Sequence, residues 1–172
     1  MKRVENLWLS RSWTTRARRE SESPDAYHFV DEATFEAHAR KGGFLEWNRV
    51  YDHRYGTPMP DAPPGHDVLL EIDVQGARDV KTRQPDAIVI LVLPPSRSAQ
   101  EQRLRGRGDP EETIAQRLAG ADAEEAEGRA LADHVVVNDE LGSAIDQAVG
   151  IVESYRAAEA RRTSPPGERT HG

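Results

Sequence analysis

The segment Ser-Trp-Thr-Thr-Arg-Ala-Arg-Arg, residues 12–19, combines hydroxyl side chains with closely spaced guanidinium groups. Arg16 and Arg19 lie three positions apart and could converge on one phosphate group, because a planar guanidinium donates two parallel hydrogen bonds to phosphate oxygens. The hydroxyl of Ser12 could fill a remaining acceptor. The alternative is a solvated basic loop without a ligand.

The segment Phe-Leu-Glu-Trp, residues 44–47, and the Tyr-Gly-Thr motif, residues 55–57, could contact a base and its phosphate. A carboxylate held on a strand, here Glu46, can accept two N–H donors from the Watson–Crick edge of guanine. The Thr57 hydroxyl could serve the carbonyl oxygen of the base, and the Tyr55 hydroxyl could bond a phosphate. The alternative is a half-exposed strand with ordinary aromatic packing.

Two carboxylates follow an apolar stretch in the segment Leu-Leu-Glu-Ile-Asp-Val-Gln-Gly, residues 69–76. Open α/β sheets bind ligands at the carboxyl ends of their strands, and carboxylates there commonly hold Mg²⁺ and its waters next to phosphates. Glu71 interrupts an otherwise apolar strand. This favours a functional role for Glu71 and Asp73 over a simple polar strand end.

A second basic segment, Arg-Leu-Arg-Gly-Arg-Gly at residues 103–108, is followed by Arg117 on the next predicted helix. Glycines on both sides of Arg107 allow a mobile segment that could bring positive charge over a phosphoryl group. The alternative is the end of a surface helix, where the helix dipole favours cations. Further along, a buried-looking strand at residues 135–137 leads to Asn138 at the same predicted sheet edge.

The elements that would position these side chains alternate between strands and helices, which predicts an α/β fold with a parallel sheet. Residues 68–72 and 88–93 are continuous apolar runs, typical of strands buried on both faces. Residues 75–84 between them are helix-like and complete a β-α-β unit. Residues 27–57, richer in aromatic residues and short strands, are predicted to form a lobe inserted beside this sheet.

Other segments are predicted from their caps and breakers. Asp31 caps a helix that Gly42-Gly43 ends, and Ser96 or Ser98 caps another. Four prolines exclude a helix over residues 58–65. The polar, turn-rich end of the chain predicts a disordered tail over residues 158–172.

Composition narrows the class of ligand. The net charge of −7 argues against a nucleic-acid backbone as the main partner, whereas two local basic segments suit a small anionic ligand. There are no cysteines, which excludes disulfides and thiolate sites. No apolar run reaches the roughly 20 residues that span a bilayer. We expect a cytoplasmic protein without a membrane partner.

Taken in order, the motifs of this chain resemble the successive landmarks of the guanylate kinase family. The motifs are Ser-x-Thr-Thr-Arg-x-x-Arg, Tyr-His-Phe-Val, Phe-Leu-Glu-Trp, Tyr-Gly-Thr, Leu-Glu-Ile-Asp-Val-Gln-Gly-Ala, Leu-Pro-Pro-Ser, Arg-Gly-Arg-Gly and Val-Val-Asn-Asp. They cover about residues 9–152. The resemblance implies a P-loop-kinase-like parallel sheet in a domain of residues 1–157, with a GMP-binding lobe at 27–57 and a lid at 103–117. It also implies transfer of the γ-phosphoryl of ATP, with Mg²⁺, to GMP.

The resemblance implies a role for each matching residue. Those expected to hold the GMP phosphate are Ser12, Arg16, Arg19, Tyr27 and Tyr55. Glu46 and Thr57 would read guanine and exclude adenine, which would leave the carboxylate unpaired. Glu71 and Asp73 would face Mg²⁺ and the phosphates. Arg107 and Arg117 would close with the lid on the transferring group, and Asn138 would lie near the adenine of ATP.

The chain departs from the family pattern in the phosphate-binding loop. Nothing in the sequence matches Gly-x-x-Gly-x-Gly-Lys-Ser/Thr, whose amides and lysine cradle the β- and γ-phosphates. In the family the strand before this loop lies between the strands matching residues 68–72 and 88–93. We therefore expect a gap, a direct pairing or a partner strand there. The proline-rich residues 58–65 also replace a family helix, and the lid after Gly108 is slightly short.

These departures leave two hypotheses. The first is a guanylate kinase whose start lies upstream or has been lost, so that the chain by itself has little activity. The second is a catalytically inactive GMP-binding or protein-interaction module. The retained arginines and Glu46 favour the first. Complementation by a separate P-loop protein has no support in the sequence.

Overall fold

The computed structural model describes residues 3–20 and 22–163 and divides into two compact units, one within residues 1–89 and one within residues 90–172. The elements of the first unit are β1 (Leu7–Leu9), β2 (Trp13–Thr14), β3 (His28–Phe29), α1 (Glu32–Arg40), β4 (Phe44–Val50), β5 (His53–Pro58), β6 (Asp67–Leu69) and α2 (Val74–Arg83). The elements of the second unit are β7 (Ile90–Leu93), α3 (Arg97–Gly106), α4 (Glu111–Leu131), β8 (His134–Val137) and α5 (Leu141–Thr163). The predicted α/β class is confirmed.

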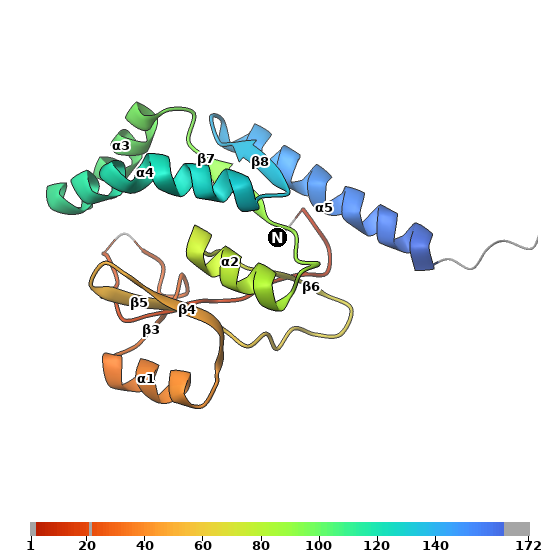
Figure 1. The fold of residues 1–172 in the computed structure, drawn as a ribbon, viewed down its shortest axis with the longest axis horizontal. Coiled ribbons are helices and arrows are strands. Elements are labelled where there is room, and N and C mark those ends of the chain that lie inside the picture. The colour runs from red at the N-terminus through yellow and green to blue at the C-terminus, as the bar shows by residue number, and fades with distance from the viewer. Residues whose placement is uncertain (1–2, 21, 164–172) are drawn as a thin grey trace, which may run out of the picture. The chain divides into compact units, whose positions relative to one another are not determined.

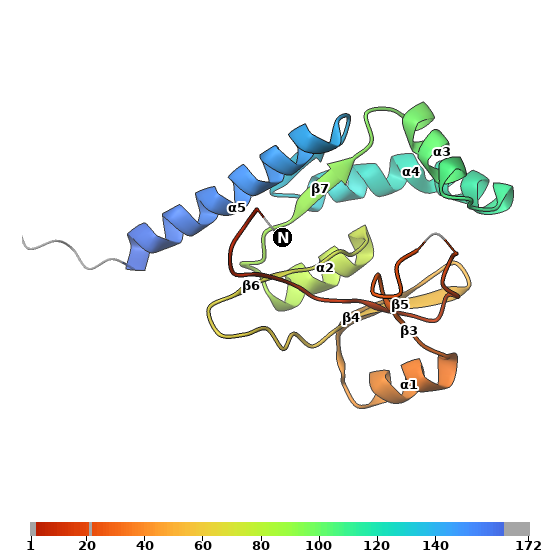
Figure 2. The same ribbon diagram turned by 180° about the vertical axis from the view of Figure 1, so that it is seen from behind.

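The centre of the first unit is a four-stranded sheet in the order β3-β2-β5-β4. Strands β2, β5 and β4 are antiparallel neighbours, and β3 runs parallel to β2. Helix α1 lies on one side of this sheet and α2 on the other (Figures 1 and 2). The predicted lobe of residues 27–57 forms most of the sheet, and β2 joins it from outside that range. Strand β5 was not predicted.

The face of the sheet toward α1 holds an aromatic core. Phe35 of α1 is fully buried, stacks on Phe44 at 4.5 Å between ring centroids and meets Trp47 edge-on at 6.0 Å. Trp13 stacks on His38 at 4.3 Å. Helix α1 begins as predicted, because the Asp31 side chain accepts a hydrogen bond from the Thr34 backbone N–H. This core fixes one face of the sheet and leaves the other face for α2 and polar side chains.

A register shift at the start of β4 directs the side chains of Phe44 and Glu46 to opposite faces of the sheet. Phe44 pairs with Pro58 and Glu46 pairs with Thr57, so that Leu45 is the extra residue between them. Without this bulge, Phe44 and Glu46 would share a face, since side chains alternate along a strand. The bulge lets Phe44 join the aromatic core while Glu46 lies on the opposite face.

In the second unit, β7 and β8 form a parallel pair in register from Ile90–His134 to Leu93–Val137. Helix α4 packs against β7, α5 packs against β8, and α3 packs against α4. Helix α3 begins at the predicted cap, where the Ser96 side chain accepts a hydrogen bond from the Ala99 backbone N–H. Helix α4 begins after Pro110, which has no side-chain cap bond.

The strands predicted to form one parallel sheet are hydrogen-bonded in two separate pairs, β1–β6 and β7–β8. No strand within the described part of the chain pairs with both β6 and β7, and residues 3–6 form turns and a bend. The central strand of the family pattern is thus missing from the described residues, as predicted. The prediction that both runs are buried on both faces is wrong: Val68, Leu69 and Val92 are exposed, because each strand has a single hydrogen-bonded neighbour.

The C-terminal prediction also needs correction. Helix α5 continues to Thr163, so residues 158–163 are helical rather than part of a disordered tail. Its last turns, Arg-Ala-Ala-Glu-Ala-Arg-Arg at residues 156–162, consist of strong helix formers. Residues 164–172 of the predicted tail lie outside the described residues. No helix forms over residues 58–65, as predicted. Among the described helices, none has the length and apolar character that a bilayer crossing requires.

Candidate nucleotide-binding site

Polar side chains gather on the face of the four-stranded sheet away from the aromatic core. Strand register places Glu46 opposite Thr57, and Asn48 opposite Tyr55. Thr57 and Tyr55 lie two positions apart on β5, so all four side chains share one face. Thr14 of β2 pairs with Tyr55 from the other side. This face is the candidate site.

The predicted phosphate-binding residues form one cluster. Arg16 donates through Nε to the Tyr55 hydroxyl at 3.2 Å. The rings of Tyr27 and Tyr55 meet edge-on at 6.0 Å, and the Arg16 guanidinium lies 5.6 Å from the centre of the Tyr27 ring. Ser12 is buried just before β2, where its carbonyl accepts a hydrogen bond from the His28 backbone N–H. The segment after β2 thus folds back so that Arg16 contacts the tyrosine hydroxyl on β5.

An acid that the sequence analysis missed holds this cluster together. Glu22 accepts hydrogen bonds from Nη1 and Nη2 of Arg16 at 3.0 and 2.8 Å. It also accepts one from the Arg19 backbone N–H at 3.2 Å and lies 3.9 Å from the Arg19 guanidinium. The hydrogen bonds from Arg16 hold the pKa of Glu22 below its usual value. In the sequence, Glu22 follows Arg16 and Arg19 at the same three-residue spacing, and this spacing could have indicated that the acid pairs with the arginines.

The predicted base-reading pair is buried. Glu46 is 5% exposed and Thr57 is 1% exposed. One carboxylate oxygen of Glu46, Oε1, accepts the Thr57 backbone N–H at 3.1 Å. The Thr57 hydroxyl is buried and makes no hydrogen bond of standard geometry, although it lies close enough to the Glu46 carboxylate to lower the pKa of that group. A buried hydroxyl without a well-formed hydrogen bond costs free energy, so its presence here favours a ligand group at this position.

Burial raises the pKa of Glu46 above its usual range, the negative charge of Asp73 raises it further, and the hydrogen bond from Thr57 opposes both. Gly76 lies beside this carboxylate. A Cβ at Gly76, on the first turn of α2, would lie 3.0 Å from Glu46 Oε2. The glycine therefore makes room for the Glu46 side chain against the helix.

Asp73 and Asn48 link α2 to the site. Asp73 is the N-cap of α2 and accepts the Gly76 backbone N–H through Oδ1 at 2.8 Å. The Asn48 amide nitrogen donates to both carboxylate oxygens of Asp73, at 2.9 and 3.1 Å. The sequence analysis missed Asn48, although it lies two positions after Glu46 on the same strand. Both oxygens of Asp73 are thus engaged beside the base-reading pair.

Glu71 differs from Asp73 in being exposed. Its negative charge lies close enough to Tyr27 to raise the pKa of that hydroxyl, after the larger effect of burial. Within the described ranges, no group of three or more histidine, aspartate or glutamate side chains is arranged to hold a metal ion. Magnesium next to nucleotide phosphates commonly needs only one or two carboxylates. Glu71 fits such a water-mediated contact better than the engaged Asp73.

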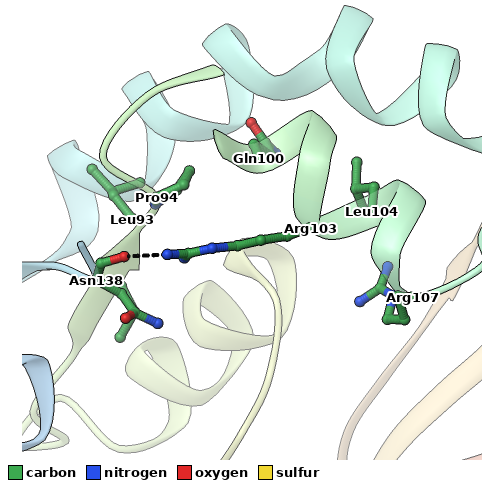
Figure 3. Close-up of a pocket in the computed structure, with 8 residues that line it drawn as sticks. Leu93, Pro94, Gln100, Arg103, Leu104, Arg107 and Asn138 are labelled. Carbon is green, nitrogen blue, oxygen red and sulfur yellow. Dashed lines mark hydrogen bonds between the residues drawn. The ribbon is translucent and has the colours of Figure 1, made fainter. Parts of the chain in front are cut away.

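The remaining predicted residues belong to the second unit. Arg107 and Asn138 line one cavity of about 300 Å³, together with Val92, Leu93, Pro94, Gln100, Arg103 and Leu104 (Figure 3). Arg103 reaches across this cavity and donates to the Asn138 backbone carbonyl at 2.8 Å. Arg107 is paired with the buried Asp109, to which its Nε donates at 3.3 Å. Arg117 is half-buried on α4.

Comparison with known proteins identifies the family of the chain. The family model described as guanylate kinase matches residues 4–155. The chain belongs to the guanylate kinase family. It is 45% identical to a guanylate kinase of Chromobacterium violaceum in an alignment that covers 88% of this chain and 75% of that protein. It is 44% identical to a guanylate kinase of Thermus thermophilus in an alignment that covers 94% of this chain and 74% of the relative.

A solved guanylate kinase has the same fold. The crystal structure of guanylate kinase from Anaplasma phagocytophilum superposes with a TM-score of 0.72 at 31% identity, covering 90% of this chain and 78% of that one. The structure groups Arg16, Tyr27 and Tyr55, and it places Tyr55 on the same face of the sheet as Glu46 and Thr57. The predicted lid residues and Asn138 are grouped separately, in the second unit.

The raised pKa of Glu46 can be measured directly. We expect a carboxyl-selective NMR titration to show Glu46 protonating above the usual glutamate range and Glu22 below it, because burial acts on the first and Arg16 on the second. Asp73→Asn should lower the pKa of Glu46, since it removes a neighbouring charge while asparagine remains a good helix N-cap. An unchanged Glu46 pKa in Asp73→Asn would contradict the proximity of the two carboxylates.

Proposed function

We propose that this chain binds GMP on the polar face of the four-stranded sheet and is the phosphoryl-acceptor part of a guanylate kinase. One observation carries the proposal: strand pairing places the base-reading pair, Glu46 and Thr57, on the same face as Tyr55, which holds Arg16. A purine base and a monophosphate joined by a ribose need these two kinds of site at neighbouring positions on one surface.

Guanine fits the base-reading pair through its hydrogen-bonding pattern. Its N1–H and amino group are donors, which a carboxylate can accept, and its O6 is an acceptor, which a hydroxyl can serve. Glu46 Oε1 is already paired with the Thr57 N–H, and the Thr57 hydroxyl makes no hydrogen bond of standard geometry. Adenine would present an acceptor nitrogen to the carboxylate. The resulting unpaired buried charge would exclude AMP.

The monophosphate fits the cluster around Arg16. Guanidinium groups bind phosphate through charge-assisted hydrogen bonds, and hydroxyl groups can donate to its remaining oxygens. Here these donors come from Arg16, Arg19, Tyr27 and Tyr55, and Ser12 is proposed to join them. Rings of Tyr27 and Phe29 lie within 6 Å of the Arg16 guanidinium and hold its plane. The arginine is therefore positioned before a ligand arrives.

Four residues and Asp73 are proposed to act on the ATP side of the reaction. Arg107 and Arg117 would close on the transferring phosphoryl group, Asn138 would lie beside the adenine of ATP, and Glu71 would contact Mg²⁺ through water, with Asp73 behind it. Bound ATP supplies the phosphoryl group and Mg²⁺ neutralises its charge. The 172-residue sequence contains no Gly-x-x-Gly-x-Gly-Lys-Ser/Thr loop, so this chain by itself should bind ATP weakly. We propose that the chain acts in purine nucleotide metabolism in the cytoplasm.

The selectivity of binding tests the base-reading pair. We expect calorimetric titration to show GMP binding at least roughly a hundredfold tighter than AMP, about 2.7 kcal/mol, because AMP leaves Glu46 unpaired. With ATP and Mg²⁺, the chain alone should form little GDP. Equal affinity for AMP and GMP would contradict the assignment of Glu46 and Thr57.

A fusion decides between the two functions. A strand, a Gly-x-x-Gly-x-Gly-Lys-Ser/Thr loop and a helix of the guanylate kinase pattern, joined ahead of this chain, should restore GDP formation if the chain is a kinase part. A fusion in which the loop lysine is replaced by alanine is the control. GMP binding without GDP formation in the intact fusion would favour the inactive GMP-binding module.

Gly76→Ala tests the base site specifically. The added Cβ would push the Glu46 carboxylate, so GMP affinity should fall by roughly tenfold, about 1.4 kcal/mol. Gly120→Ala in α4 is the matched control, because its Cβ would meet nothing within 4 Å. Calorimetry with both variants gives the comparison. If Gly76→Ala bound GMP as tightly as Gly120→Ala, the carboxylate would not lie where the base binds.

A further inference from the structure

Glu22 occupies a distinctive position within the proposed phosphate site. Its carboxylate accepts hydrogen bonds from both terminal nitrogens of Arg16 and from the Arg19 backbone N–H. The side chains of Arg16 and Glu22 are 12% and 17% exposed, so the ion pair is largely shielded from water. The Glu22 backbone N–H in turn donates to the Arg19 carbonyl at 3.1 Å. The acid therefore joins both predicted phosphate-binding arginines.

The hydrogen bonds of Arg16 show which part of the guanidinium remains for a ligand. A guanidinium carries five N–H groups, and two of its edges each present a pair of them. Glu22 takes the edge formed by Nη1 and Nη2, and the second Nη1 hydrogen goes to the Ala17 carbonyl at 2.7 Å. The other edge, Nε with the second hydrogen of Nη2, lies toward the Tyr55 hydroxyl. Because Nε donates to that hydroxyl, phosphate would bind here to the second hydrogen of Nη2 and to the Tyr55 hydroxyl, which keeps its own hydrogen to donate, while Glu22 stays in place.

We infer that Glu22 is a positioning residue of the monophosphate site: it holds Arg16 and the Arg19 backbone so that the Nε edge of Arg16 faces the phosphate beside Tyr55. The inference rests on the proposed binding of GMP. Glu22 does not touch the substrate. It acts by removing the rotational freedom of a long side chain, which would otherwise be lost when the ligand binds.

Positioning and simple electrostatics predict opposite results when the charge of Glu22 is removed. A carboxylate close to a bound phosphate repels it, so by charge alone Glu22→Gln should strengthen GMP binding. If Glu22 positions Arg16, the neutral amide can accept only one of the two guanidinium hydrogen bonds, and GMP binding should weaken. The sign of the change therefore separates the two roles.

The experiment compares GMP with guanosine, which lacks the phosphate. We expect Glu22→Gln to lower GMP affinity by about tenfold or more, equivalent to about 1.4 kcal/mol, and to leave guanosine affinity within about twofold of the original chain, as measured by calorimetry or NMR titration. Glu22→Asp keeps the charge but shortens the reach and should give an intermediate loss. Glu20→Gln is the matched control, because Glu20 is an exposed acid two positions away.

Each result decides the inference. GMP affinity in Glu22→Gln equal to or above that in Glu20→Gln would overturn it, as would an equal loss of GMP and guanosine affinity, which would indicate a structural role only. If the original chain bound guanosine but bound GMP no more tightly, or bound neither, the proposed function itself would fail and this inference with it. A phosphate-specific loss confined to Glu22 variants supports it.

Discussion

The buried carboxylate of Glu46 is held on one face of β4 by a bulge that sends its neighbour Phe44 to the other. The aromatic core around Phe35 fixes the first face, and the pairing of Glu46 with Thr57 fixes the second. Because the carboxylate is buried, its ionisation is unfavourable and its pKa is raised. A ligand that donates hydrogen bonds to the carboxylate offsets this cost. Burial of Glu46 therefore favours ligands that carry hydrogen-bond donors at this position.

The two halves of the polar face carry opposite charge. The base-reading half holds negative charge, with Asp73 close to Glu46 and tied to Asn48. The phosphate half holds positive charge that Glu22 partly neutralises. A nucleotide monophosphate matches this division, since its base edge donates hydrogen bonds and its phosphate is an anion. Complementarity at both ends provides specificity beyond what either half could give.

Sequence patterns predicted the elements that depend on neighbouring residues, such as helices and their caps. The cap at Asp31, the helix over residues 75–84 and the order of the motifs all gave correct elements or the correct family. The partners that act across the fold were not visible in the same way. Asn48 meets Asp73 25 positions away, and only strand register brings them together. Exposure of the apolar strand at residues 67–69 likewise depends on a missing neighbour rather than on its composition.

The central claim is that one surface of the first unit receives both the base and the phosphate of GMP. A crystal structure of this chain grown with GMP tests it most directly. We expect the guanine edge to lie against Glu46 and the Thr57 hydroxyl, and the phosphate to lie against the Nε edge of Arg16 and the Tyr55 hydroxyl. GMP bound on any other surface, or a base turned away from Glu46, would contradict it.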